Sequence, residues 1–137
     1  MMKLFSALLI LLFSVATYAE VVVIVHPSNN NSFTKEEIES LFMVKKSSFA
    51  DGSKASAYYL SADDVARHQF DEKVLGKSSS QLKAYWSKLV FTGKGTPPPE
   101  LSNSSDAVAK VAGDASAIAY VDKAAVKEGV KVVFTLP

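Results

Sequence analysis

The sequence contains no cysteine among its 137 residues. Disulfide bonds, thiolate metal sites, cysteine nucleophiles and a lipid-modified N-terminal cysteine are therefore excluded. An excess of charge of one sign is also lacking, since 15 Lys and Arg residues stand against 14 Asp and Glu. Nucleic-acid-binding domains carry a basic excess, so the charge balance argues against nucleic acid as a partner. The length predicts one domain, large enough to bury a core without covalent staples.

An apolar run from Leu4 to Ala16 lies at the N-terminus, behind the positive charge of Lys3. Thr17-Tyr18-Ala19 follows and ends in a small residue, a pattern typical of a secretory signal peptide. The alternative is a membrane anchor, but a spanning helix needs roughly 20 apolar residues and this run is shorter. We therefore expect residues 1–19 to be a cleaved signal peptide and residues 20–137 to form the exported domain.

Apolar periodicity and turn residues divide the rest of the chain into alternating strands and helices. A continuous β-branched run at residues 20–25 predicts a strand covered on both faces. We expect further strands at residues 55–60, 117–121 and 130–134, helices from residues 34, 61, 78 and 105, and a helical turn at residues 122–127. This alternation predicts an α/β fold with a small, largely parallel or mixed sheet flanked by helices.

Helix-start signals are strong in this sequence. Three capping boxes are predicted: Thr34 with Glu37, Ser61 with Asp64, and Ser78 with Gln81. Leu60 and Val65 flank the second box in the positions of a hydrophobic staple. A helix N-terminus can bind an anion, but here the first turn already carries acidic side chains. This helix either binds a ligand or satisfies its own N–H groups.

Patterns that would indicate catalysis, nucleotide binding or a metal are weak. His26 and His68 are the only histidines, whereas a zinc site needs three or four ligands. GKGT at residues 93–96 lacks the order and the following helix of a phosphate-binding P-loop, so we interpret it as a surface loop. No G-x-S-x-G elbow occurs around any serine. The sequence therefore predicts neither an enzyme nor a metal or other cofactor.

Binding remains, and polar residues follow the predicted strands where ligands sit in open α/β sheets. They lie after the first strand (Pro27 to Ser32), after the second (Ser61 to Asp64) and after the third. The candidate ligand-binding residues are Ser28, Asn29, Asn30, Ser61, Asp64, Arg67 and Asp122. The alternative interpretation is that they are turn and helix-cap residues, because these residue types lead at such positions.

Five stretches follow one another in an order that is characteristic of a known family. They are ESLFMVKK at residues 39–46, FADGSKA at 49–55, FDEKVLG at 70–76, KAYWSKLVFTGKGTPPP at 83–99 and AIAYVDKAAV at 117–126. Together they resemble the phosphate ABC transporter substrate-binding proteins, and the third-strand segment is similar to that family's AIGYV strand. The resemblance extends from Val21 to Val133 and implies a type II periplasmic-binding-protein fold and a periplasmic location.

The resemblance also implies where phosphate would bind. Full-length members close two lobes over phosphate, and this chain, about half as long, resembles one lobe. Their SGT triplet, six residues before a phenylalanine, falls here on Asp64-Val65-Ala66, and Arg67 is the nearest cation. A carboxylate about 4 Å from phosphate would repel it by roughly a kcal/mol or more. We therefore expect weak or no phosphate binding by the monomer.

Two functions follow from these expectations. The first is an exported solute-binding-like domain that binds phosphate or a related small anion for transport or sensing. The alternative is a ligand-free interaction module that docks on an inner-membrane transporter or sensor protein. Calorimetric titration with phosphate separates the two, because only the first releases or absorbs heat of binding.

Overall fold

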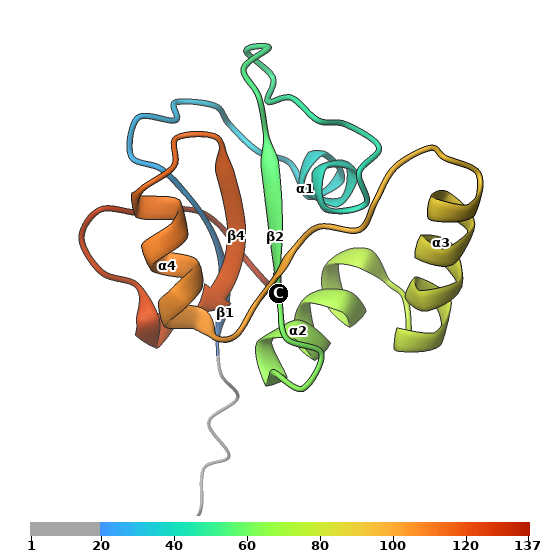
Figure 1. Cartoon of the computed structure of the whole chain (residues 1–137). Helices are drawn as coiled ribbons and strands as arrows, with labels where there is room; N and C mark the ends of the chain where they lie inside the picture. Colours follow the sequence, from blue (N-terminus) through green and yellow to red (C-terminus); the bar gives the residue numbers. More distant parts are fainter. Residues whose placement is uncertain (1–19) are drawn as a thin grey trace, which may run out of the picture.

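The computed structural model describes residues 20–137, so the expected signal peptide lies outside the described residues. A single five-stranded mixed sheet, in the order β3-β2-β4-β1-β5, forms the centre of the domain (Figure 1). Its strands are β1 (Val21–Val25), β2 (Ser56–Leu60), β3 (Glu100–Leu101), β4 (Ala117–Asp122) and β5 (Lys131–Thr135). The predicted α/β class is confirmed, and the short β3 is an addition to the predicted strands.

Strand directions divide the sheet into two halves. β2 runs parallel to β3 and β4, whereas β1 runs antiparallel to both β4 and β5. Val21 pairs with Asp122 and Val25 with Ile118, so the end of β1 lies beside the start of β4. All five residues of β1 are buried, as the β-branched run predicts, because helices cover both faces of the central strands.

The helices are α1 (Lys35–Phe42), α2 (Val65–Phe70), α3 (Ser79–Phe91) and α4 (Ser104–Ala112). Asp71–Leu75 continues α2 as a π-helical turn, and Lys123–Ala125 is a 3₁₀ turn after β4. Neighbouring side chains of a strand point to opposite faces. The Tyr59 ring stacks on Phe42 of α1, while Lys110 of α4 lies 5.3 Å from the centre of the Tyr58 ring. α4 therefore covers one face of the sheet and α1 the other.

Four aromatic rings fill the core on the α1 face. Phe70 of α2 stacks on Tyr120 of β4 with ring centres 4.1 Å apart, and Phe42 meets Phe70 at 4.7 Å. The Tyr59 hydroxyl donates to the Phe42 carbonyl at 2.7 Å, and the Tyr120 hydroxyl accepts from the Leu60 N–H at 3.0 Å. Burial raises the pKa of both tyrosines above its usual value. Both hydroxyls thus stay protonated and tie α1 and β2 to the core.

Most predicted helix ends are confirmed. Thr34 caps α1 by accepting the Glu37 N–H at 3.2 Å, although the Glu37 side chain does not complete the predicted capping box. Ser78 and Gln81 form the complete capping box of α3, with bonds of 2.9 and 3.2 Å. Gly76 ends the helix that contains α2 in a left-handed conformation, at φ 62°, which glycine adopts without strain. These features depend only on residues within a few positions of one another.

The prediction that Ser61 caps the second helix is wrong. α2 begins at Val65 and its cap is Asp64, whose Oδ1 accepts the Ala66 N–H at 2.8 Å. The Asp64 N–H donates to the Ser61 carbonyl at 2.9 Å, so residues 61–64 form a turn instead of the first helical turn. Val65 is 62% exposed, so it makes no staple with the buried Leu60. Aspartate caps a helix as well as serine does, and Arg67 of the helix that Asp64 caps pairs with Glu100 of β3.

A candidate ligand-binding cleft

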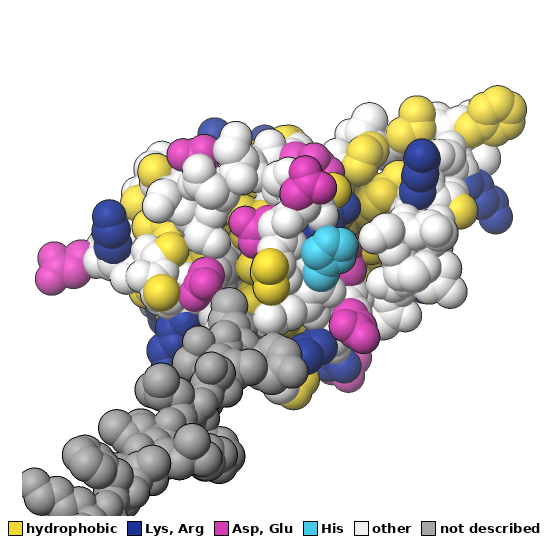
Figure 2. Space-filling model, turned by 90° about the horizontal axis from the view of Figure 1, so that it is seen from below, with side chains coloured by type: hydrophobic (Ala, Val, Ile, Leu, Met, Phe, Trp, Pro, Cys, Tyr) yellow, Lys and Arg dark blue, Asp and Glu magenta, His cyan; other side chains and the backbone are white. Residues whose placement is uncertain are grey.

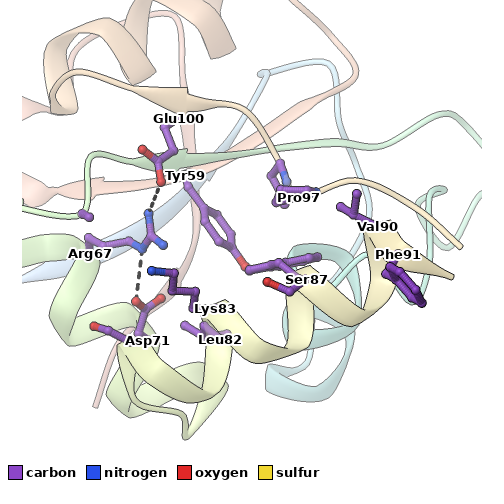
Figure 3. A pocket seen from close by; sticks show the side chains of 14 residues that line it. Tyr59, Arg67, Asp71, Leu82, Lys83, Ser87, Val90, Phe91, Pro97 and Glu100 are labelled. Carbon is purple, nitrogen blue, oxygen red and sulfur yellow. Dashed lines mark hydrogen bonds and ion pairs between the residues drawn. The ribbon is translucent and has the colours of Figure 1, made fainter. Parts of the chain in front are cut away.

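A cleft of about 810 Å³ opens between α2, α3 and the loop that leads into β3 (Figure 3). Apolar side chains form most of its wall, and a small ionic cluster lies on one side of it. The lining residues are Tyr59, Ala62, Arg67, Asp71, Ser79, Leu82, Lys83, Trp86, Ser87, Val90, Phe91, Pro97, Pro98 and Glu100. Clefts of this size commonly hold small organic molecules.

Arg67 organises the ionic cluster. Its Nε bonds to Asp71 Oδ2 at 3.1 Å, and its Nη1 bonds to Glu100 Oε1 at 2.9 Å. Figure 3 shows the two carboxylates on opposite sides of the guanidinium. Nη1 also donates to the Leu60 carbonyl at 2.9 Å, and the guanidinium lies 4.7 Å from the centre of the Tyr59 ring. The arginine is therefore held at the end of β2 by four contacts.

Burial acts on both charges of the Arg67–Asp71 pair. The side chains are 12% and 7% exposed. Burial lowers the pKa of Arg67, but the hydrogen bond to Glu100 and the negative charge of Asp71 outweigh it and raise the pKa overall. Burial raises the pKa of Asp71, and the nearby Arg67 offsets this only in part. The Arg67 guanidinium is thus shared between the side chains of Asp71 and Glu100.

Two buried polar atoms of the cleft residues make no hydrogen bond within the described part of the chain. They are Oδ1 of Asp71, an acceptor, and Nε1 of Trp86, a donor. Asp71 is 5% exposed and Trp86 is 8% exposed. A buried polar group left without a partner costs roughly 1–3 kcal/mol, so two such atoms beside one cavity are unusual.

The predicted ligand-binding residues do not form one site. β2 and β4 are parallel, so Ser61, Asp64, Arg67 and Asp122 follow them at the same end of the sheet. β1 is antiparallel to β4, so Ser28, Asn29 and Asn30 lie at the opposite end. The expectation of a single edge assumed that all three strands run in one direction, which β1 does not. Only Arg67, of the seven predicted residues, lines the cleft.

Five of the other six predicted residues have local structural contacts. At the end of β1, the Ser28 hydroxyl bonds to Nδ1 of His26 at 2.7 Å, and Oδ1 of the buried Asn29 accepts the Asn31 N–H at 3.0 Å. Asn30 is an exposed residue of the same turn. At the other end, Ser61 and Asp64 form the turn and cap of α2, and Asp122 caps the 3₁₀ turn by accepting the Ala124 N–H at 2.9 Å.

Sequence reasoning missed three charged residues of the cleft, Asp71, Lys83 and Glu100, and its tryptophan, Trp86. The Arg67–Asp71 pair has a spacing of four residues, which puts both on one helix face and was readable from the sequence. Glu100 is 33 residues from Arg67 and meets it only because β3 pairs with β2. No local signal reports that contact.

Other site types find little support in residues 20–137. No three His, Asp or Glu side chains gather there in an arrangement that could hold a metal ion. Among the same residues, the helices are too short or too polar to cross a membrane.

Comparison with known proteins gives matches only among solved structures, since no family model and no curated protein matches the chain. The structures are an ABC-type phosphate transport receptor from Vibrio cholerae (13% identity, TM-score 0.66), a putative phosphate ABC transporter substrate-binding protein with bound phosphate from Clostridium perfringens (18%, 0.66) and PstS from Borrelia burgdorferi (9%, 0.62). Each match covers 83% of this chain and 45%, 44% and 46% of the respective neighbour. The chain thus has the fold of the phosphate ABC transporter substrate-binding proteins, over less than half of their length.

Proposed function

We propose that this chain is an exported, non-enzymatic solute-binding lobe that binds phosphate or a related small anion at Arg67, for transport or sensing. The observation that supports this is a guanidinium at the side of a cleft, in a fold whose neighbour from Clostridium perfringens is described with bound phosphate. Arg67 lies in α2, and its guanidinium can present paired N–H donors to an oxyanion.

An anion would have to displace one of the carboxylates that now hold Arg67. Glu100 is the better candidate, because its side chain is 53% exposed while that of Asp71 is 7% exposed. An ion pair with a solvent-exposed partner stabilises a protein by only about 0–1 kcal/mol. Phosphate could therefore replace the Glu100 carboxylate at Nη1 at little cost, whereas the buried Asp71 would stay in place.

Calorimetric titration of residues 20–137 with phosphate tests this proposal. We expect the Glu100→Gln variant to bind phosphate more tightly than the parent, because the competing negative charge is gone. Arg67→Gln should abolish the heat of binding. Lys123→Gln is the matched control, since it removes a cation from an exposed pair with Glu20 outside the cleft. Absence of heat with phosphate, sulfate and organic phosphates in every variant would overturn the proposal.

Export to the periplasm is part of the same proposal. The apolar run and small residues before Glu20 support a cleaved signal peptide. N-terminal sequencing of the protein recovered from the periplasmic fraction of an expressing bacterium should begin at Glu20. A protein that retains Met1 and stays with the membrane fraction would indicate an anchor instead.

A second candidate function is docking on an inner-membrane transporter or sensor protein. The observation in its favour is the end of α3, where Val90 is 51% exposed and Phe91 is 92% exposed. Figure 2 shows hydrophobic side chains gathered on the right of the face it draws, where α3 lies. A photocrosslinker at position 91 should join the chain to a membrane protein in intact cells. The same probe at Val132, 41% exposed on β5, should not.

A further inference from the structure

We propose that the cleft binds a small organic molecule with an apolar body and an uncharged head group that both donates and accepts hydrogen bonds. A hydroxyl or a primary amide has this chemistry. The inference concerns the part of the cleft beside α3 and does not require that phosphate bind to Arg67. It therefore stands or falls separately from the anion-binding proposal.

The size and the walls of the cleft favour an organic ligand. A volume of about 810 Å³ lies within the usual range for small-molecule sites and is far larger than one tetrahedral anion fills. Leu82 and Val90 of α3 face it from one side, and Pro97 of the loop faces it from the other (Figure 3). Because apolar surface gains stability on leaving water, such walls bind a hydrocarbon body better than a hydrated ion.

The charges of the lining residues favour an uncharged head group. Arg67 and Lys83 are balanced by Asp71 and Glu100, so the side chains around the cleft carry no net charge. An anionic head group would have to displace a carboxylate that is paired with Arg67, at 2.9 or 3.1 Å, or pair with Lys83, which makes no ion pair within the described residues. An uncharged group leaves these pairs intact.

The two unpartnered atoms define what the head group must offer. Oδ1 of Asp71 needs a donor, and Nε1 of Trp86 needs an acceptor. Asp71 and Trp86 are both more than nine-tenths buried and both line the cleft. The indole is held by edge contacts with Tyr85 and Tyr59, whose ring centres lie 4.9 and 6.1 Å away. Both atoms have almost no exposed surface, so the side chains of Asp71 and Trp86 must shift before a ligand that supplies both a donor and an acceptor can recover the two missing hydrogen bonds.

Trp86 makes the test direct, because it is the only tryptophan of the chain. Its fluorescence, excited where tyrosine does not absorb, is measured in residues 20–137 during titration with benzyl alcohol, with benzamide and with inorganic phosphate. We expect benzyl alcohol and benzamide to change the emission with a saturating curve in about the millimolar range, as ligand efficiency permits for molecules of this size. Phosphate added at the same concentrations should change the affinity for benzyl alcohol and for benzamide by less than twofold.

Substitutions in the cleft wall test whether the two probes bind in the cleft. Val90→Ser and Phe91→Ser both change exposed side chains of the wall, so folding should be unaffected, and we expect several-fold weaker binding of both probes. Val132→Ser, at an apolar position on β5 that is 41% exposed against 51% for Val90, is the matched control and should bind as the parent does. A response that is linear in probe concentration, or equal in the Val90 and Val132 variants, would overturn the inference. Phosphate binding with no probe binding would overturn it while leaving the anion proposal standing.

Discussion

The aromatic core and the cleft are neighbouring regions that differ in whether their buried polar groups are hydrogen-bonded. In the core, the hydroxyls of Tyr59 and Tyr120 each make a hydrogen bond, at 2.7 and 3.0 Å. In the cleft, Oδ1 of Asp71 and Nε1 of Trp86 make none within the described chain. Tyr59 belongs to both regions, since its hydroxyl meets α1 and its ring supports Arg67. This difference is the basis on which we propose that the cleft binds a partner outside the chain.

The largest expected difference between the two regions concerns phenylalanine. Phe70→Ala removes a fully buried ring that stacks on Tyr120 at 4.1 Å, and we expect a loss of about 3–5 kcal/mol in the free energy of unfolding. Phe91→Ala, at a position 92% exposed, should change that free energy by less than about 0.5 kcal/mol. Urea denaturation followed by circular dichroism measures both. Equal losses would show that the cleft rim is part of the folding core.

The next effect concerns the tyrosine hydroxyls of the core. Tyr59→Phe leaves the buried Phe42 carbonyl without its donor, and we expect a loss of about 1–3 kcal/mol in the free energy of unfolding. Tyr85→Phe is the matched variant, because its hydroxyl donates to the Met43 carbonyl at 2.9 Å from a half-buried ring. Water can replace that bond more easily, so its loss should be smaller. The reverse order would mean that the hydrogen bond of the half-buried Tyr85 contributes more stability than that of the buried Tyr59.

A smaller effect tests the start of α2, which delivers Arg67 to the cleft. Asp64→Ala removes the acceptor for the Ala66 N–H and should cost about 0.5–2 kcal/mol in thermal or urea unfolding. Ser61→Ala should cost almost nothing, because the Ser61 hydroxyl bonds to no described residue while its carbonyl bond to Asp64 remains. If Ser61→Ala lowered the stability and Asp64→Ala did not, the helix would be capped by Ser61, as the sequence pattern predicts.

The smallest expected effect is a change of stability with pH. Its sign should differ between Asp71 of the cleft and Asp114 on the surface. Burial raises the pKa of Asp71, so the native state holds its proton to higher pH than the unfolded chain does. This group's contribution to stability therefore falls as pH rises from the ordinary aspartate value through the raised one. Asp71→Asn should remove that slope. Urea midpoints measured at several pH values between acid and neutral report it.

Asp114 gives the matched contrast, because hydrogen bonds from the Ser116 side chain and N–H lower the pKa of its carboxyl. A lowered pKa contributes stability above the ordinary value, and this contribution is lost as pH falls through the lowered one. Asp114→Asn should therefore flatten a slope of the opposite sign. The same sign in both variants would contradict the raised pKa of Asp71.

The sequence predictions were most accurate for contacts between residues that are close in the sequence, and they failed for contacts between distant segments. Capping by Thr34 and Ser78 and the left-handed Gly76 were predictable, since their partners lie within a few residues. Capping of α2 was misplaced because Ser61 and Asp64 are both good caps, and local chemistry does not choose between them. The Arg67–Glu100 pair was unpredictable, because it depends on β3 pairing with β2 across a long loop.

The sequence by itself determined most of the elements, the buried strand at Val21–Val25 and the α/β class, because these follow from side-chain periodicity, caps and turn residues. Only the tertiary structure decided that β1 runs antiparallel to β4, which separates Asn29 from Arg67 at opposite ends of the sheet. It also decided that Arg67 shares its charge with two carboxylates and that Trp86 faces a cleft. Strand direction and ion pairing are set by contacts between distant segments, and such contacts produce no periodic pattern in the sequence.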